Sequence, residues 1–157
     1  MKLIERIARI SNRIYDRIRH PKAFTIGNDD AVDGDLGALR GKKYAVLVTF
    51  RRTGEAVPSP VWFGVDDAGR AYTRTLHNAG KVKRIRNNPL ALIAPSTVRG
   101  KPTGPAIRAT ARVLPKEEWP HAEEALAAAY GVSRKLYEGI LGGPEEMGTY
   151  IEISPRS

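Results

Sequence analysis

Short apolar runs separated by glycine-containing turns constrain the fold of this chain more than any other feature. Residues Tyr44–Phe50 are rich in β-branched and aromatic side chains, as buried strands are, and a turn containing Gly54 follows them. A second strand is predicted at Ala56–Val65, and a third at Arg70–Thr75 after the turn at 66–69. Because short turns reverse the chain direction, we expect these three strands to form an antiparallel sheet.

The second predicted strand contains two prolines, Pro58 and Pro60. Proline has no N–H group to donate to a neighbouring strand, so sheets tolerate it mainly at edges and bulges. We therefore expect part of this strand to lie at an edge or a bulge, or where its backbone is left free of the sheet.

After the third strand the chain is predicted to contain both helices and further strands. A short helix is predicted to end at the Asn87-Asn88-Pro89 sequence. Together with the first three strands, the later elements indicate a mainly β fold with flanking helices, a small barrel of six to seven mostly antiparallel strands. The later elements are strands at Leu90–Ala94, Ile107–Leu114 and Thr149–Ile153, and helices at His121–Tyr130 and from Ser133 to about residue 141.

Residues 3–19 have the pattern of a basic amphipathic helix. Apolar residues recur every three or four positions from Leu3 to Ile18, and six Lys or Arg residues lie between positions 2 and 19. Such a helix packs on its own core, on a partner subunit or on an anionic membrane surface. Contact with a partner subunit is our first hypothesis, and peripheral contact with a membrane is the second.

The composition excludes several kinds of site. The chain of 157 residues has no cysteine, and His20, His77 and His121 match no metal-ligand spacing, so we predict no metal site. No apolar run approaches the roughly 20 residues needed to cross a bilayer, and no secretory signal is recognisable. We expect a cytoplasmic protein with one barrel domain at 38–157, preceded by an extension at 1–37.

The middle of the chain is strongly basic. Between Asp67 and Glu117 lie 49 residues with eleven Lys or Arg and no acid, whereas the rest of the chain has 15 basic and 17 acidic residues. Several of these cations fall at the start of the short helix, where the macrodipole is already positive and each cation costs about 0.3–1 kcal/mol. A bound anion would remove this cost. The alternative is a solvated basic face without a ligand.

No arrangement of catalytic residues is recognisable in the sequence. Ser59 has neither a histidine nor an acid nearby, and Gly80-Lys81 lacks the glycine spacing of a phosphate loop. Paired carboxylates such as Asp66-Asp67 are explained as turn residues. The catalytic residues are therefore unassigned, and we expect a bound cofactor to supply the chemistry.

Nucleic acid is a weaker candidate for the ligand than a small anion. Proteins that bind single strands place aromatic side chains beside their cations. The acid-free stretch contains a single aromatic residue, Tyr72. One aromatic residue beside eleven cations favours a phosphate or carboxylate ligand, although contact with a duplex backbone stays open as an alternative.

Five segments in a fixed order resemble a known family, the pyridoxamine 5'-phosphate oxidase-like split β-barrel flavoproteins. Within that family the chain is similar to the actinobacterial flavin/deazaflavin oxidoreductases that use coenzyme F420. The hairpin Arg99–Pro105 strengthens the similarity, which covers roughly residues 38–154. The five segments are Tyr44–Phe50, the turn at 52–55, Pro58–Phe63, Tyr72–Thr75 and Gly80–Pro89.

The resemblance implies an oxidoreductase that transfers hydride from the reduced deazaflavin to a small organic acceptor. It also implies a homodimer with the cofactor in a basic groove between the subunits. An FMN- or FAD-dependent reductase of the same fold and a non-catalytic ligand-binding protein are the alternatives. One position departs from the family, because Gly80 stands where pyridoxamine phosphate oxidases proper carry an arginine.

The same resemblance implies a set of cofactor-binding residues. The second strand presents its backbone to the ring system, and the phosphate is bound at the end of the third strand and by a lysine. Lys83 and Arg84 extend the groove toward the polyanionic tail of F420, which needs a larger basic patch than FMN does. For Trp62, Ser59 and Thr75, ordinary roles in the core, a turn and a strand are the alternatives. The residues implied are Ser59, Pro60, Val61 and Trp62 for the ring and Arg74, Thr75, Lys81, Lys83 and Arg84 for the anionic groups.

Overall fold

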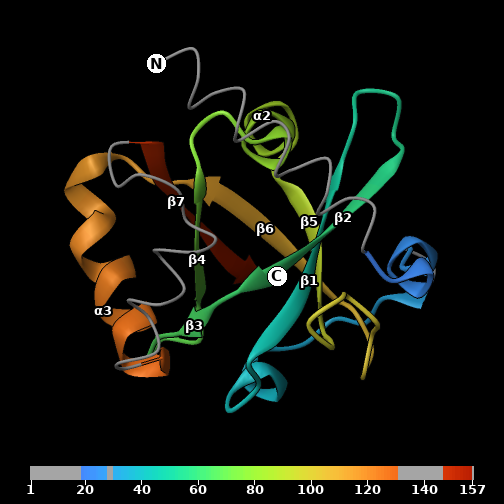
Figure 1. Cartoon of the computed structure of the whole chain (residues 1–157), viewed down its shortest axis with the longest axis horizontal. Coiled ribbons are helices and arrows are strands. Elements are labelled where there is room, and N and C mark those ends of the chain that lie inside the picture. The colour runs from blue at the N-terminus through green and yellow to red at the C-terminus, as the bar shows by residue number, and fades with distance from the viewer. Residues whose placement is uncertain (1–18, 28–29, 131–146, 157) are drawn as a thin grey trace.

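The computed structural model describes residues 19–27, 30–130 and 147–156. Seven antiparallel strands form one curled sheet in the order β2-β1-β5-β6-β7-β4-β3 (Figure 1). The prediction of a split β-barrel with six to seven mostly antiparallel strands is confirmed. The strands are β1 Tyr44–Phe50, β2 Ala56–Trp62, β3 Gly64–Val65, β4 Ala71–Leu76, β5 Leu90–Pro95, β6 Ile107–Val113 and β7 Gly148–Pro155.

The second predicted strand is divided in the structure. The chain leaves β2 at Trp62, and after Phe63 it enters β3, which pairs with β4 instead of β1. These two consecutive strands form opposite edges of the sheet, so the short connection between them requires the sheet to curl (Figure 1). The Thr73 hydroxyl donates to the Trp62 carbonyl at 2.6 Å and bridges the two halves. The sequence predicted one continuous strand at 56–65 because Phe63, at the break, is a buried apolar residue like those of a strand.

The two prolines lie in an edge strand, as predicted. Pro58 faces Val48 and Pro60 faces Val46 across the β1–β2 pair, and in the described part of the chain no strand pairs with the other side of β2. An N–H group is therefore missing at a sheet edge, where this loss is tolerated. The arrangement leaves one side of β2 available to other groups.

The described part of the chain contains two α-helices, which pack against different parts of the sheet. Helix α2, Gly80–Asn87, follows β4 and buries Val82 and Ile85, and α3, Trp119–Tyr130, covers β3 and β4 (Figure 1). Among the described residues, no helix is long and apolar enough to cross a membrane. The predicted helices at 3–19 and 133–141 lie outside the described residues, apart from Arg19, which is not helical. The described residues also include three short 3-10 helices, η1 Pro21–Thr25, η3 Gly37–Leu39 and η4 Lys116–Glu118.

The main hydrophobic core fills the inside of the curled sheet. Large side chains such as Leu47, Phe63 and Ile93 are almost fully buried there. Leu36 and Leu39, which precede the first strand, are also fully buried in this core. The residues just before the barrel are therefore part of its packing.

Candidate anion-binding site

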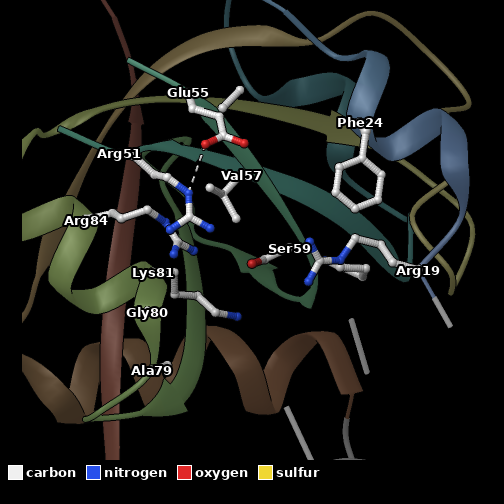
Figure 2. Close-up of a pocket in the computed structure, with 12 residues that line it drawn as sticks. Arg19, Phe24, Arg51, Glu55, Val57, Ser59, Ala79, Gly80, Lys81 and Arg84 are labelled. Atoms are coloured by element: carbon white, nitrogen blue, oxygen red, sulfur yellow. Dashed lines mark ion pairs between the residues drawn. The ribbon is translucent and has the colours of Figure 1, made fainter. Parts of the chain in front are cut away.

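A pocket of about 380 Å³ lies where β2, the β1–β2 turn, the start of α2 and the segment before η1 meet (Figure 2). Its volume falls in the range of small-molecule sites, roughly 300–1,000 Å³. The described residues that line it include four cations and one carboxylate. These charged residues are Arg19, Arg51, Lys81, Arg84 and Glu55.

The start of α2 brings two of these cations to the pocket. Lys81 and Arg84 lie one turn apart and line the same side, and the first turn of α2 contains no acidic residue. Within the described part of the chain, the N-cap residue Ala79 makes no side-chain hydrogen bond to the helix end. The positive end of the helix dipole and two cations thus add up at one place, which favours an anion there.

Contacts with two neighbours hold the Arg84 side chain over the start of its own helix. The Arg84 Nε donates to the Thr49 hydroxyl at 2.7 Å, and Thr49 is fully buried in β1. A Cβ atom added at Gly80 would lie 2.7 Å from Nη1 of Arg84, closer than such atoms approach. Glycine at position 80 therefore provides the space that the Arg84 guanidinium occupies.

Edge strand β2 forms the floor of the pocket. Ser59 and Pro60 line it together with Ala56 and Val57, and Ser59 is only 9% exposed. Figure 2 shows Ser59 between the side chains of Lys81 and Arg19. A hydroxyl group beside cations can donate to an anion, while the adjacent Pro60 and Val57 offer apolar surface.

The structure brings four of the nine residues predicted for the site together. Ser59, Pro60, Lys81 and Arg84 line the pocket, and the other five do not. Val61 points into the barrel core, and Lys83 is exposed on α2. Lys83 is two positions from Lys81, so the rotation of the helix turns it away from the pocket. In β2 the pocket ends before Val61, which packs in the core instead.

The three remaining predicted residues lie in other surroundings. Trp62 is half-buried between the rings of Tyr44 and Tyr130, at centroid distances of 5.4 and 5.0 Å. Arg74 is 6% exposed on β4, and its guanidinium packs against Gly148 of β7 so closely that a Cβ there would overlap it. Thr75 is half-buried at the end of the same strand. Their assignment to a cofactor stays a prediction.

Of the eight pocket-lining residues that sequence reasoning missed, four have charged or aromatic side chains: Arg19, Phe24, Arg51 and Glu55. Arg51 forms an ion pair with Glu55 at 3.3 Å across the β1–β2 turn, with both side chains more than half exposed, so this pair contributes little to stability. This turn lies outside the basic stretch at 68–116 and has the composition of an ordinary hairpin turn. The sequence did not place Arg19 and Phe24 in the site, because Arg19 falls at the end of the predicted helix at 3–19 and both residues belong to the extension at 1–37.

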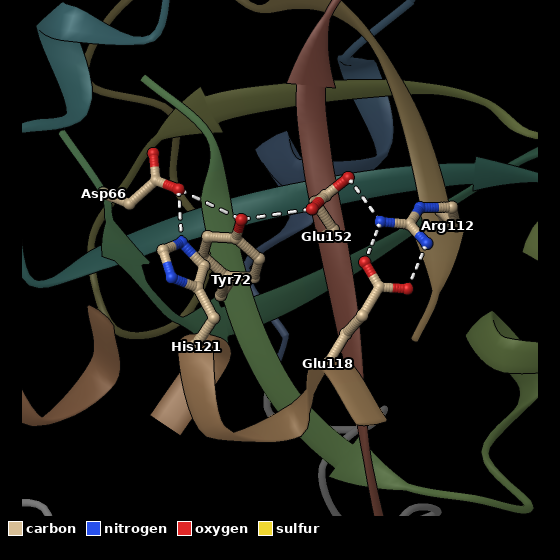
Figure 3. Close-up of polar contacts among 6 residues, drawn as sticks. All are labelled: Asp66, Tyr72, Arg112, Glu118, His121 and Glu152. Carbon is tan, nitrogen blue, oxygen red and sulfur yellow. Dashed lines mark hydrogen bonds and ion pairs between the residues drawn. The ribbon is translucent and has the colours of Figure 1, made fainter. Parts of the chain in front are cut away.

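A second group of polar and charged side chains lies on β4, β6, β7, η4, α3 and the turn after β3, and it lines no part of the pocket (Figure 3). The Asp66 carboxylate contacts the His121 ring at 2.8 Å and accepts from the Tyr72 hydroxyl at 3.0 Å. The same hydroxyl lies 3.1 Å from a Glu152 oxygen, and Arg112 contacts Glu152 at 3.2 Å. Arg112 also makes a two-pronged ion pair with Glu118, at 2.7 and 2.8 Å. We call these six residues the polar network.

The polar network shifts the ionisation of its own members. Its hydrogen bond to Asp66 raises the pKa of His121 above the ordinary value of 6.5, although partial burial opposes this. Burial opposes ionisation of Asp66, but hydrogen bonds from His121, the Arg70 N–H and Tyr72 hold the pKa of Asp66 below 3.8. Burial and the two carboxylates raise the pKa of Tyr72. Each charge thus has a partner of opposite sign, as in a structural network.

Comparisons with known proteins identify the fold without assigning a family. No family model and no curated protein matches the chain. A FAD-binding protein from Mesorhizobium loti aligns with a TM-score of 0.56 and 14% identity, over 76% of this chain and 83% of that one. A putative pyridoxamine 5'-phosphate oxidase from Listeria innocua aligns with a TM-score of 0.51 and 17% identity, over 78% and 90% of the two chains.

Other structures of the same fold have different roles. HutZ, the heme storage protein from Vibrio cholerae, aligns with a TM-score of 0.57 and 16% identity, over 75% of this chain and 84% of that one. The chain spans only 50% of another match, a protein of unknown function from Agrobacterium tumefaciens. Identities this low show the split-barrel fold alone, so the ligand of this chain has to be argued from its pocket.

Proposed function

We propose that the chain is an oxidoreductase that binds coenzyme F420 in this pocket and reduces a small organic acceptor. The observation that carries the proposal is the convergence of Lys81, Arg84 and the positive start of α2 on Ser59 of the edge strand. Phosphate and carboxylate groups are bound by such clusters of charged and neutral donors. A pocket with one carboxylate and four cations suits a ligand with more than one negative charge.

The residues of the pocket fit the two chemical parts of such a cofactor. Lys81 and Arg84 would bind the phosphate, and Lys83, exposed on α2, would meet the polyanionic tail outside the pocket. Ser59 and Pro60 would position the ring against the edge of β2 and exclude water from it. When bound, the reduced deazaflavin supplies the hydride, so the protein needs no strong acid–base pair of its own.

We further propose that the protein acts as a homodimer, with Arg74, Thr75 and the backbone of Val61 and Trp62 facing the cofactor groove from the barrel. This part of the proposal depends on the resemblance to the split-barrel oxidoreductases. It would be supported by a dimer in sedimentation analysis and contradicted by a cofactor-bound monomer.

Two proteins of the same fold suggest other ligands for this pocket. The FAD-binding neighbour of the same fold makes an FMN- or FAD-dependent reductase the second candidate. The heme storage neighbour makes non-catalytic binding of a ligand the third candidate. The paired charges at Arg51 and Glu55 do not distinguish these candidates, because all three ligands are anionic.

Titration of the purified protein with F420, FMN, FAD and heme, followed by absorbance, tests the proposal. We expect the tightest binding for F420, and oxidation of the reduced cofactor when nitroaromatic or quinone acceptors are added. If FMN or FAD binds more tightly than F420, the second candidate, a flavin-dependent reductase, is supported instead. Binding of F420 without turnover on any acceptor would contradict the enzymatic role, and absence of binding to all four would contradict the site.

A further inference from the structure

The pocket has a second wall, formed by residues that precede the barrel. Arg19 lies just before η1 and Phe24 lies within it, and both line the pocket across from Lys81 and Arg84 (Figure 2). The two walls differ in chemistry, because the α2 side is cationic and the η1 side contains an aromatic ring.

Several contacts hold this second wall in place. The His20 N–H donates to the Arg99 carbonyl at 2.7 Å, and Ala23 is only 1% exposed. Gly100 has φ +91°, and a Cβ added to it would lie 3.1 Å from Pro60 and 3.3 Å from Ala23. The backbone of η1 is therefore packed tightly between the 96–102 loop and the strand that floors the pocket.

The aromatic side chain on this wall is exposed in spite of the tight packing of its backbone. Phe24 is 58% exposed, although it lines a pocket and its neighbour Ala23 is buried. The Arg19 guanidinium lies over the Phe24 ring, 5.3 Å from its centroid. An exposed aromatic ring with a cation on it offers stacking surface to a planar ring, whose burial gains hydrophobic and stacking energy together.

We infer that Phe24, with Arg19, recognises the planar aromatic ring of a ligand whose anionic group is held by Lys81 and Arg84. The ligand class is thus an anionic heteroaromatic compound, not a simple phosphate or an aliphatic polyanion. The inference rests on the proposed function, because it assigns a second part of the same ligand to the same pocket. It makes the segment before the barrel a determinant of specificity.

Binding of three probes by the purified full-length protein separates the contribution of the ring from that of the anion. FMN carries both an aromatic ring and a phosphate, and F420 carries the same two parts, whereas pyrophosphate carries only the anion. We expect Phe24→Ala to weaken FMN and F420 binding about tenfold and to leave pyrophosphate affinity unchanged, since one stacked ring contributes this much. Phe24→Trp keeps an aromatic surface, so it should bind both ring ligands at least as well as the parent protein.

Leu90→Ala is the matched control. Leu90 is 41% exposed and lies outside the pocket, so this variant should bind every probe as the parent protein does. Equal affinity of the Phe24→Ala variant and the parent for the ring ligands would overturn the inference, and so would an equal loss for pyrophosphate. In both cases a loss of affinity in Lys81→Ala would still support the proposed function. If the parent protein binds no ring ligand, the proposed function fails and this inference fails with it.

Discussion

The pocket and the polar network both gather charged side chains, but they do so in opposite ways. In the polar network each carboxylate contacts a cation or a hydroxyl group. Arg112 contacts two of the carboxylates by itself. In the pocket four cations face one carboxylate, and two of the cations lie at the positive end of a helix. Charges that satisfy one another stabilise the fold, whereas an excess of one sign destabilises it until an anion binds.

The local sequence around each region explains this difference. Helix α2 has basic residues throughout and no acid in its first turn, so nothing within it can neutralise Lys81 and Arg84. The polar network instead draws on residues up to 86 positions apart, from Asp66 to Glu152, that β4 and β7 bring side by side. Unbalanced charge is thus visible in the sequence, while balanced charge is produced by the fold.

Removing both cations of α2 from the pocket is expected to have the largest effect. The double variant Lys81→Ala with Arg84→Ala should lose about 100-fold in affinity for F420 and for pyrophosphate, because each charged contact contributes about 1.5–3 kcal/mol before screening. Calorimetric titration at low salt measures both affinities. Arg86→Ala, an exposed cation of the same helix that does not line the pocket, is the control and should lose less than about twofold. Equal losses in the two variants would mean that the helix attracts anions only by its overall charge.

Positioning of Arg84 by its neighbour in β1 is expected to have a smaller effect. Thr49→Val removes the acceptor of the Arg84 Nε without changing the size of a fully buried side chain. We expect affinity for pyrophosphate to fall about five- to tenfold, because the guanidinium loses its fixed orientation. Thr49→Ser keeps the hydroxyl and should restore most of this affinity. A loss in the Ser variant as large as that in the Val variant would assign the effect to packing in β1.

Much of the fold was predictable from the sequence because its signals are local. Apolar runs between turns gave the strands, and Pro58 and Pro60 indicated the edge position of β2. The division of that strand at Phe63 was not predictable, because it depends on which strand each half pairs with. A buried phenylalanine continues a strand pattern whether or not the pairing continues.

The pocket was only partly predictable from the sequence. Lys81 and Arg84 followed from the basic helix start and from the resemblance, and Ser59 and Pro60 from the proline-containing strand. Lys83 and Val61 do not line the pocket, because the sequence alone does not reveal where α2 and β2 meet it, and their assignment to the cofactor stays a prediction. Arg19 and Phe24 reach the pocket through contacts with the 96–102 loop, which no local pattern predicts.

The polar network is expected to have the smallest effect. It should contribute a little to the stability of the fold and should not change ligand affinity in the pocket. His121 has a pKa raised above 6.5 in the folded chain, so its contribution is complete below pH 6.5 and is lost as the pH rises through the folded pKa. Asp66 has a pKa held below 3.8, so its contribution is present above pH 3.8 and is lost as the pH falls through the folded pKa. The pair therefore stabilises the fold most between about pH 4 and 6.5.

The variant His121→Gln keeps a hydrogen-bonding side chain and removes the titration. We expect its free energy of unfolding to fall below that of the parent by less than about 1 kcal/mol near pH 5.5, because the His121 side chain is 57% exposed and solvent screens the pair. The difference should shrink as the pH rises above 6.5, and urea unfolding at several pH values measures it. Pyrophosphate affinity should stay equal to that of the parent, since His121 lines no part of the pocket. A change in affinity would show that the network and the pocket are coupled through the sheet, and the separation of a structural from a binding region would then be wrong.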